Sequence, residues 1–83
     1  MVNKKLSDLA VGERGIVLAI DAPSEVADQL LELGIGVGET LSMEGQSPFG
    51  DPIVIGLMNY RLSLRKSEGD KVILRDIEKR SNR

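Results

Sequence analysis

Three carboxylates in the segment after Pro23 have the spacing that could bind a metal ion. Glu25, Asp28 and Glu32 follow each other at i, i+3 and i+7, so a helix would place them one turn apart on one side. Grouped carboxylates can bind a hard divalent cation. Carboxylates alone would not select iron over abundant magnesium, however. We therefore favour a solvated helix face, and we predict no metal site and no cofactor.

Residue types limit catalytic chemistry further. The 83-residue chain contains no histidine and no cysteine, which removes the commonest general base and the thiol nucleophile. The glycines of segment 34–38 do not indicate a nucleotide site, because they follow the expected helix instead of preceding one. We read them as a helix end followed by a turn. The sequence predicts a protein that is not an enzyme.

A short basic row is the clearest charged feature of the second half of the chain. Arg61, Arg65 and Lys66 could meet an acidic partner surface, with Arg75 beside them if its strand lies alongside. A solvated strand face explains the row without a partner, and we favour that interpretation. The net charge of −2 and the pI near 5.0 argue against general binding of nucleic acid.

The segment from Pro48 to Pro52 has two interpretations. A rigid turn bounded by prolines and presenting Phe49 would lose little entropy on binding, so it could be a recognition loop that includes Asp51. Alternatively, Phe49 caps the core and the prolines only shape the turn. We favour the second interpretation, because the chain has only one other aromatic residue, Tyr60, and a lone Phe is valuable in a core.

One helix is expected, from Ser24 to Leu33. Ser24 can cap its first turn, and Gly34 suits the left-handed position that ends a helix, with Ile35 contacting Leu30 in a Schellman ending. An apolar stripe of Val26, Leu30 and Leu33, flanked by Ala27 and Leu31, would pack on the rest of the domain. Val26, Leu30 and Leu33 are enough to pack the helix against the domain. Leu31 is therefore left over and is the strongest candidate for a docking residue.

Alternating apolar residues predict five strands. They are expected over residues 13–21, 39–44, 52–58, 61–66 and 71–76. Gly12 and Gly38 can take the positive φ of a turn into a strand, Gly56 suits a bulge, and Asn59-Tyr60 suits a hairpin. The pattern predicts an all-β fold: a small SH3-like, five-stranded antiparallel barrel with one α-helix inserted after the first strand. A ferredoxin-like domain would need a second helix.

The chain reads as a single domain over residues 1–77, followed by a charged and frayed tail over 78–83. No apolar signal region follows Lys4 and Lys5, and no apolar run approaches the roughly 20 residues needed to span a bilayer. We expect a cytoplasmic protein.

Four ordered motifs resemble a known family. They are Leu6-Ser7-Asp8-Leu9, the helix end at 30–34, the segment 48–52, and the run from Arg61 to Lys66. Together they resemble the ferrous iron transport protein A (FeoA) family over almost the whole chain. The resemblance implies an SH3-like barrel in the bacterial cytoplasm that assists the ferrous iron permease FeoB through its cytosolic G-protein region. It also implies similarity to the C-terminal domain of iron-dependent repressors.

These observations favour an adaptor that modulates FeoB and reaches the inner face of the membrane only through that transporter. A metal-linked regulatory or sensory domain is the alternative, and a nucleic-acid module of the KOW type ranks last. Weak self-association stays open. The candidate partner-binding residues are Leu31, Pro48, Phe49, Asp51, Pro52, Tyr60, Arg61 and Arg65.

Overall fold

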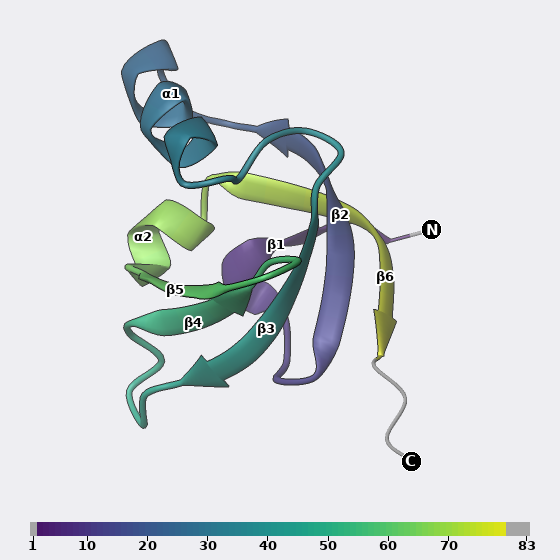
Figure 1. The fold of residues 1–83 in the computed structure, drawn as a ribbon. Coiled ribbons are helices and arrows are strands. Elements are labelled where there is room, and N and C mark those ends of the chain that lie inside the picture. Colours follow the sequence, from purple (N-terminus) through teal and green to yellow (C-terminus); the bar gives the residue numbers. More distant parts are fainter. Residues whose placement is uncertain (1, 80–83) are drawn as a thin grey trace.

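The protein folds around one bent antiparallel sheet, which confirms the predicted all-β class (Figure 1). The structure is a computed structural model and describes residues 2–79. The sheet has the order β1-β6-β2-β3-β4-β5. Its strands are β1 (Lys4–Lys5), β2 (Glu13–Ile20), β3 (Thr40–Gln46), β4 (Ile53–Gly56), β5 (Arg61–Leu64) and β6 (Val72–Lys79).

Six strands are present within residues 2–79, where the sequence predicted five. The additional strand, β1, has only two residues, and it pairs Lys4 with Leu74 and Lys5 with Ile73 of β6. Two residues are too few to show an alternating pattern, so only the pairing with β6 defines this strand. The predicted inserted helix is α1 (Ser24–Glu32), which follows β2.

Two short helical segments complete the fold: η1, a 3₁₀ turn over Leu6–Asp8, and α2 (Lys66–Gly69), where the sequence predicted a plain turn. They connect the two ends of the sheet. A side chain at Gly69 would press on Ser7 and Ile53, so α2 packs closely against η1. The Ser7 hydroxyl also donates a hydrogen bond to the Asp70 carboxylate. This contact joins two sheet ends that no strand pairing connects within residues 2–79.

Aliphatic side chains from all parts of the fold form the core. In β3, Leu41 and Met43 point inward as predicted, and in β5 Leu64 is buried while Arg61 is exposed. The buried apolar residues are Leu6, Leu9, Val17, Leu30, Ile35, Leu41, Met43, Ile53, Ile55, Leu64, Val72 and Leu74. No aromatic residue belongs to this core, so the narrow interior is filled by branched aliphatic side chains and one methionine.

The end of α1 follows the sequence prediction, but its start does not. At the end, Gly34 has φ +98°, Ile35 N–H donates to Leu30 O at 2.9 Å, and Gly34 N–H donates to Leu31 O at 2.9 Å. This is the predicted Schellman ending. At the start, Ser24 was expected to cap the helix and does not. Pro23 occupies the capping position, and its carbonyl accepts the N–H groups of Val26 and Ala27 at 3.0 Å.

Gly12 and Gly38 have φ of +96° and +94°, which confirms the two predicted turns into strands. The region around β4 differs from the prediction. Strand β4 ends at Gly56, and Leu57 N–H donates to Tyr60 O at 2.8 Å, so the hairpin turn lies at Met58-Asn59. Asn59 does not use a positive φ. The bulge interrupts β3 between Met43 and Gly45 and does not fall at Gly56.

Gly56 lies close to side chains of β3. A Cβ there would lie 2.6 Å from the Ser42 hydroxyl of the neighbouring strand, so a larger residue would force that side chain to move. At the C-terminal end, β6 continues to Lys79. Glu78 pairs with Arg14, and Lys79 pairs with Glu13, so both are strand residues and not part of a frayed tail. Residues 80–83 lie outside the described part of the chain.

Candidate functional site

A group of exposed apolar side chains lies where α1 meets the β4–β5 hairpin. Leu31 of α1 is 61% exposed and Met58 at the hairpin turn is 90% exposed, while Leu33 and Tyr60 are about half exposed. Leu57 is partly buried, and its side chain lies close to Gly34 at the end of the helix. We call this set, Leu31, Leu33, Leu57, Met58 and Tyr60, the helix–hairpin surface. Exposed apolar side chains gathered in this way are typical of a protein-binding surface.

Tyr60 fixes the helix to the hairpin. Its hydroxyl donates a hydrogen bond to Leu33 O at 2.6 Å, so it satisfies a carbonyl at the helix end. The contact requires Gly34, because a Cβ there would overlap the Tyr60 hydroxyl and lie 3.1 Å from Leu57 Cδ2. Leu30 is the one fully buried residue of α1. The position of the helix therefore depends on Leu30, the Schellman turn and Tyr60.

Two shallow hollows flank the hairpin. One, of about 310 Å³, includes Gly38, Gly56 and Met58 in its lining. The other, of about 410 Å³, includes Glu44, Tyr60 and Arg61. Both are open to solvent, and neither brings titratable groups together in an enclosed space. Hollows beside an adaptable methionine suit the side chains of a protein partner better than a reaction.

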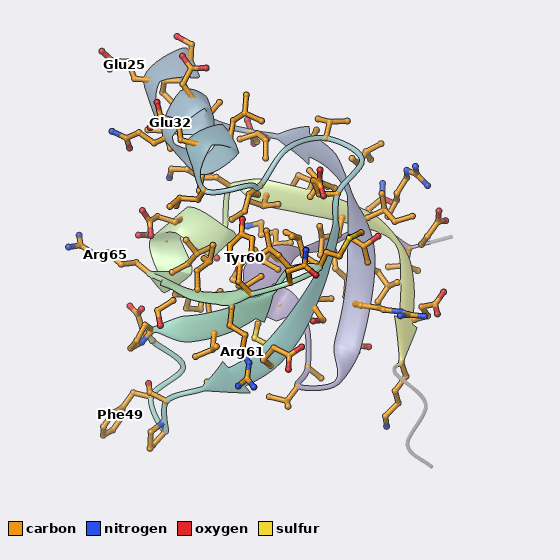
Figure 2. All side chains as sticks on the ribbon, viewed as in Figure 1. Glu25, Glu32, Phe49, Tyr60, Arg61 and Arg65 are labelled. Carbon is orange, nitrogen blue, oxygen red and sulfur yellow. The ribbon has the colours of Figure 1, made fainter. Side chains whose placement is uncertain are left out.

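Phe49 lies at the opposite end of the molecule from α1 (Figure 2). It is 94% exposed, so the interpretation of Phe49 as a core cap is wrong. The core excludes Phe49 because it is already filled by aliphatic residues, and the loop carries the ring beyond the end of β3. The exposure leaves the recognition-loop hypothesis for Pro48 and Phe49 open.

The Phe49 loop is held in place by its own hydrogen bonds. Asp51 N–H donates to Ser47 Oγ at 3.0 Å, Ser47 Oγ donates to Asp51 O at 2.6 Å, and Gly50 N–H donates to Ser47 O at 2.8 Å. The Asp51 carboxylate accepts Lys66 N–H at 2.9 Å, which ties the loop to the start of α2. The peptide bond between Asp51 and Pro52 is cis. Phe49 is thus presented by an ordered turn.

The predicted partner-binding residues fall into separate groups. Leu31 and Tyr60 belong to the helix–hairpin surface, and Pro48, Phe49, Asp51 and Pro52 belong to the Phe49 loop. Arg61 and Arg65 are exposed near β5, and Figure 2 shows that they point in different directions, so they do not form one compact basic patch. Within residues 2–79, neither arginine forms an ion pair.

Sequence reasoning missed Leu33 and Met58 as surface residues. Leu33 was assigned to the packed stripe of the helix, and Met58 to a strand that ends two residues earlier. The Asn59 turn signal, shifted by one residue, was the only local hint that Met58 lies at the hairpin turn. Neither exposure could be read from periodicity, because periodicity does not define where the neighbouring element ends.

The carboxylates do not indicate a metal centre. Within residues 2–79, no three His, Cys, Asp or Glu side chains gather closely enough to hold a metal ion. Figure 2 shows Glu25 and Glu32 pointing outward from α1.

Two other carboxyl groups have lowered pKa values with structural causes. The Ala10 N–H and then Lys4 lower the pKa of Glu13, and the Ser7 hydroxyl lowers the pKa of Asp70. Among residues 2–79, no helix is long and apolar enough to cross a membrane.

Comparison with protein-family models identifies the family. The FeoA domain model matches residues 4–76. The chain belongs to the FeoA domain family. The FeoA family is linked to ferrous iron transport: a relative from Porphyromonas gingivalis is a fusion of Fe(2+) transport protein A with the Fe(2+) transporter FeoB. That relative is 26% identical over 68 residues, which are 82% of this chain and 8% of the relative, so the chain spans a small part of its length.

Solved FeoA structures share the fold. The FeoA-like protein of Clostridium acetobutylicum is 31% identical, with a TM-score of 0.80, over all of this chain and 94% of its own. The zinc-complexed FeoA of Stenotrophomonas maltophilia is 28% identical, with a TM-score of 0.79, over 98% of this chain and all of its own. It is described as a prokaryotic SH3-domain protein and a candidate activating factor of ferrous iron transport. The predicted SH3-like architecture is therefore confirmed.

The barrel also occurs in larger proteins. A manganese-dependent transcriptional repressor matches with a TM-score of 0.79 at 17% identity, over 89% of this chain and 36% of the repressor. At this identity the likeness shows the fold alone.

Proposed function

We propose that this FeoA domain is a non-enzymatic accessory protein that binds the cytosolic region of a FeoB-type ferrous iron transporter. The observation that carries the proposal is the relative in which a FeoA domain and FeoB are one chain. Fusion holds two modules at high effective concentration, which is useful when the two modules contact each other. Contact between the two modules requires an exposed binding surface on the FeoA domain.

The helix–hairpin surface is the best candidate for that contact. Leu31 and Met58 expose apolar area to water at a substantial cost, which a partner would remove by covering them. Tyr60 holds the helix end against the hairpin, so the surface is largely formed before binding and little order has to be created. The Phe49 loop is a separate second candidate, and its internal hydrogen bonds also hold it in a defined conformation before binding.

The domain would act on transport by preferring one state of the transporter. A binding partner shifts a conformational equilibrium only by its difference in affinity for the two states. We propose that the FeoA domain distinguishes the nucleotide-dependent states of the cytosolic G-protein region. In this proposal it works in the cytoplasm and is recruited to the inner face of the membrane by the transporter. The absence of histidine and cysteine from the sequence supports a role without catalysis, as do the two hollows beside the hairpin, which are open to solvent.

The test is binding of the purified domain to the soluble cytosolic region of the cognate FeoB, with and without guanine nucleotide. We expect binding whose affinity depends on the nucleotide. The variants Leu31→Ser and Met58→Ser should weaken it by about tenfold each if these residues are central to the interface. Val11→Ser is the matched control, because Val11 is also an exposed aliphatic residue but lies outside the surface.

A parallel titration with ferrous ion tests the alternative of a metal-linked regulatory domain. The zinc-complexed relative is the observation that favours this alternative. Stoichiometric, tight metal binding without any contact to the transporter region would overturn the adaptor proposal. If Leu31→Ser, Met58→Ser and Val11→Ser all bind equally well, the contact does not lie on the helix–hairpin surface.

A further inference from the structure

Strand β5 forms one free edge of the sheet. Arg61–Leu64 pairs with β4 on one side, and no other strand within residues 2–79 pairs with it. Figure 1 shows β5 at this end of the sheet, next to α2. An unpaired edge presents backbone N–H and C=O groups that can hydrogen-bond a further strand.

The hairpin defines which backbone groups are free. Leu57 N–H donates to Tyr60 O, so positions 57 and 60 form a hydrogen-bonded pair. In an antiparallel ladder such pairs alternate along each strand. Leu62 and Leu64, opposite Ile55 and Ile53, therefore direct their backbone groups toward β4. The N–H and C=O groups of Arg61 and Ser63 point away from β4, where no strand of the described residues 2–79 pairs with them.

The side chains at this edge are polar and basic. Arg61 and Ser63 are both exposed, and Arg65 follows directly after the strand. Since neither arginine forms an ion pair within residues 2–79, their charge is available to a partner. The edge also continues directly from Tyr60, so a strand bound there would adjoin the helix–hairpin surface.

We propose that β5 is a strand-addition site that accepts an extended segment with acidic residues at alternate positions. The inference rests on the proposed function and places this segment in the cytosolic region of the transporter. Backbone hydrogen bonds to Arg61 and Ser63 bind the segment, while one carboxylate meets Arg61 at the start of β5 and another meets Arg65, which follows its end. The strand is short, so the segment needs to be only a few residues long.

A second copy of this chain fits the edge poorly. If two β5 strands paired antiparallel through their outward groups with Ser63 facing Ser63, Arg61 of one copy would lie opposite Arg65 of the other. Like charges directly opposite each other destabilise a strand pair. The same two arginines favour a partner strand of opposite charge, and we assign the site to an acidic segment for this reason.

The test compares Ser63→Pro with Ser63→Ala in binding to the cytosolic region of the cognate FeoB. Proline removes the outward N–H at position 63 and is tolerated at an edge strand, because that N–H does not bond to β4. Alanine keeps the N–H and removes only the hydroxyl. We expect Ser63→Pro to weaken binding by about tenfold, since one partner carbonyl loses its donor, and Ser63→Ala to change it by less than about twofold. Circular dichroism checks that both variants fold.

Amide hydrogen exchange of the wild-type domain provides a readout that needs no variant. In the free domain the amides of Arg61 and Ser63 should exchange faster than those of Leu62 and Leu64. In the complex they should slow by about tenfold or more, as paired strand amides do. Arg61→Glu should also weaken binding and reduce its dependence on salt.

The outcomes separate the two proposals. If wild-type protein binds but Ser63→Pro binds as Ser63→Ala does and the two amides stay fast, the strand-addition site is refuted while the proposed function stands. If wild-type protein does not bind the transporter region at all, both are overturned. Protection of Arg61 and Ser63 that appears only as the domain dimerises would assign the edge to a second copy instead.

Discussion

Replacing Gly34 with alanine should destabilise the domain more than replacing Gly45, a strand glycine with open space around it. Gly34 has φ +98°, and holding an alanine in a left-handed conformation costs about 1–2 kcal/mol. The new Cβ would also displace the Tyr60 hydroxyl and break its hydrogen bond to Leu33 O, which contributes about 0.5–1.5 kcal/mol. Together these terms predict a loss of about 1.5–3.5 kcal/mol in the free energy of unfolding.

The two terms can be separated with a double-mutant cycle. Tyr60→Phe removes the hydroxyl, so it should cost about 1 kcal/mol by itself and should relieve the overlap with a Cβ at position 34. In the Tyr60→Phe background, Gly34→Ala should then cost the backbone term and a small adjustment of Leu57, whose Cδ2 lies 3.1 Å from the new Cβ. We expect a coupling energy of about 1 kcal/mol between the two positions.

Urea unfolding followed by circular dichroism at pH 7 measures these values, and thermal unfolding should show a Tm lower by about 10 °C or more for Gly34→Ala. Gly45→Ala is the matched control, because a Cβ there lies 4.0 Å from its nearest neighbour and the backbone is not left-handed. Strictly additive effects of Gly34→Ala and Tyr60→Phe would refute the contact between the helix end and the hairpin.

Three further predictions use the same unfolding assay. Leu30→Ala should cost about 2–5 kcal/mol, because Leu30 is 1% exposed; a loss below 1 kcal/mol would mean that α1 is not seated by this residue. Phe49→Ala should change stability by less than about 0.5 kcal/mol, since the ring is exposed; a large loss would restore the core-cap interpretation. The lowered pKa of Glu13 means that its charge stabilises the fold at neutral pH, so the stability difference between wild type and Glu13→Gln should shrink as pH falls below about 4.3 and through that lowered pKa. A difference that stays constant between pH 7 and pH 3 would contradict this.

Local sequence predicted the features that depend on neighbouring residues. The Schellman ending at Gly34, the positive φ of Gly12 and Gly38, and the inward alternation of Leu41 and Met43 all follow from backbone sterics or from a period of two. Ser24 is the local exception. The helix begins one residue earlier than its capping signal implies, because Pro23 already has the extended backbone of a capping residue.

Contacts between distant segments could not be predicted in this way. The pairing of Lys4–Lys5 with β6, the closure of η1 on α2, and the hydrogen bond from Tyr60 to Leu33 each join residues far apart in the chain. The candidate site depends on such contacts. Leu31 was expected to be exposed and is, but the contact of Tyr60 with Leu33 O requires the turn at Gly34 and the β4–β5 hairpin to meet in space.

The all-β class, the helix after the first long strand and the resemblance to the FeoA family could be predicted from motif order and apolar periodicity, which are properties of the chain. The exposure of Phe49, the position of Met58 at a turn and the edge position of β5 within residues 2–79 became visible only in the folded domain. Periodicity says which residues share a face, whereas exposure depends on whether another segment covers that face, and that is settled only when the whole chain packs.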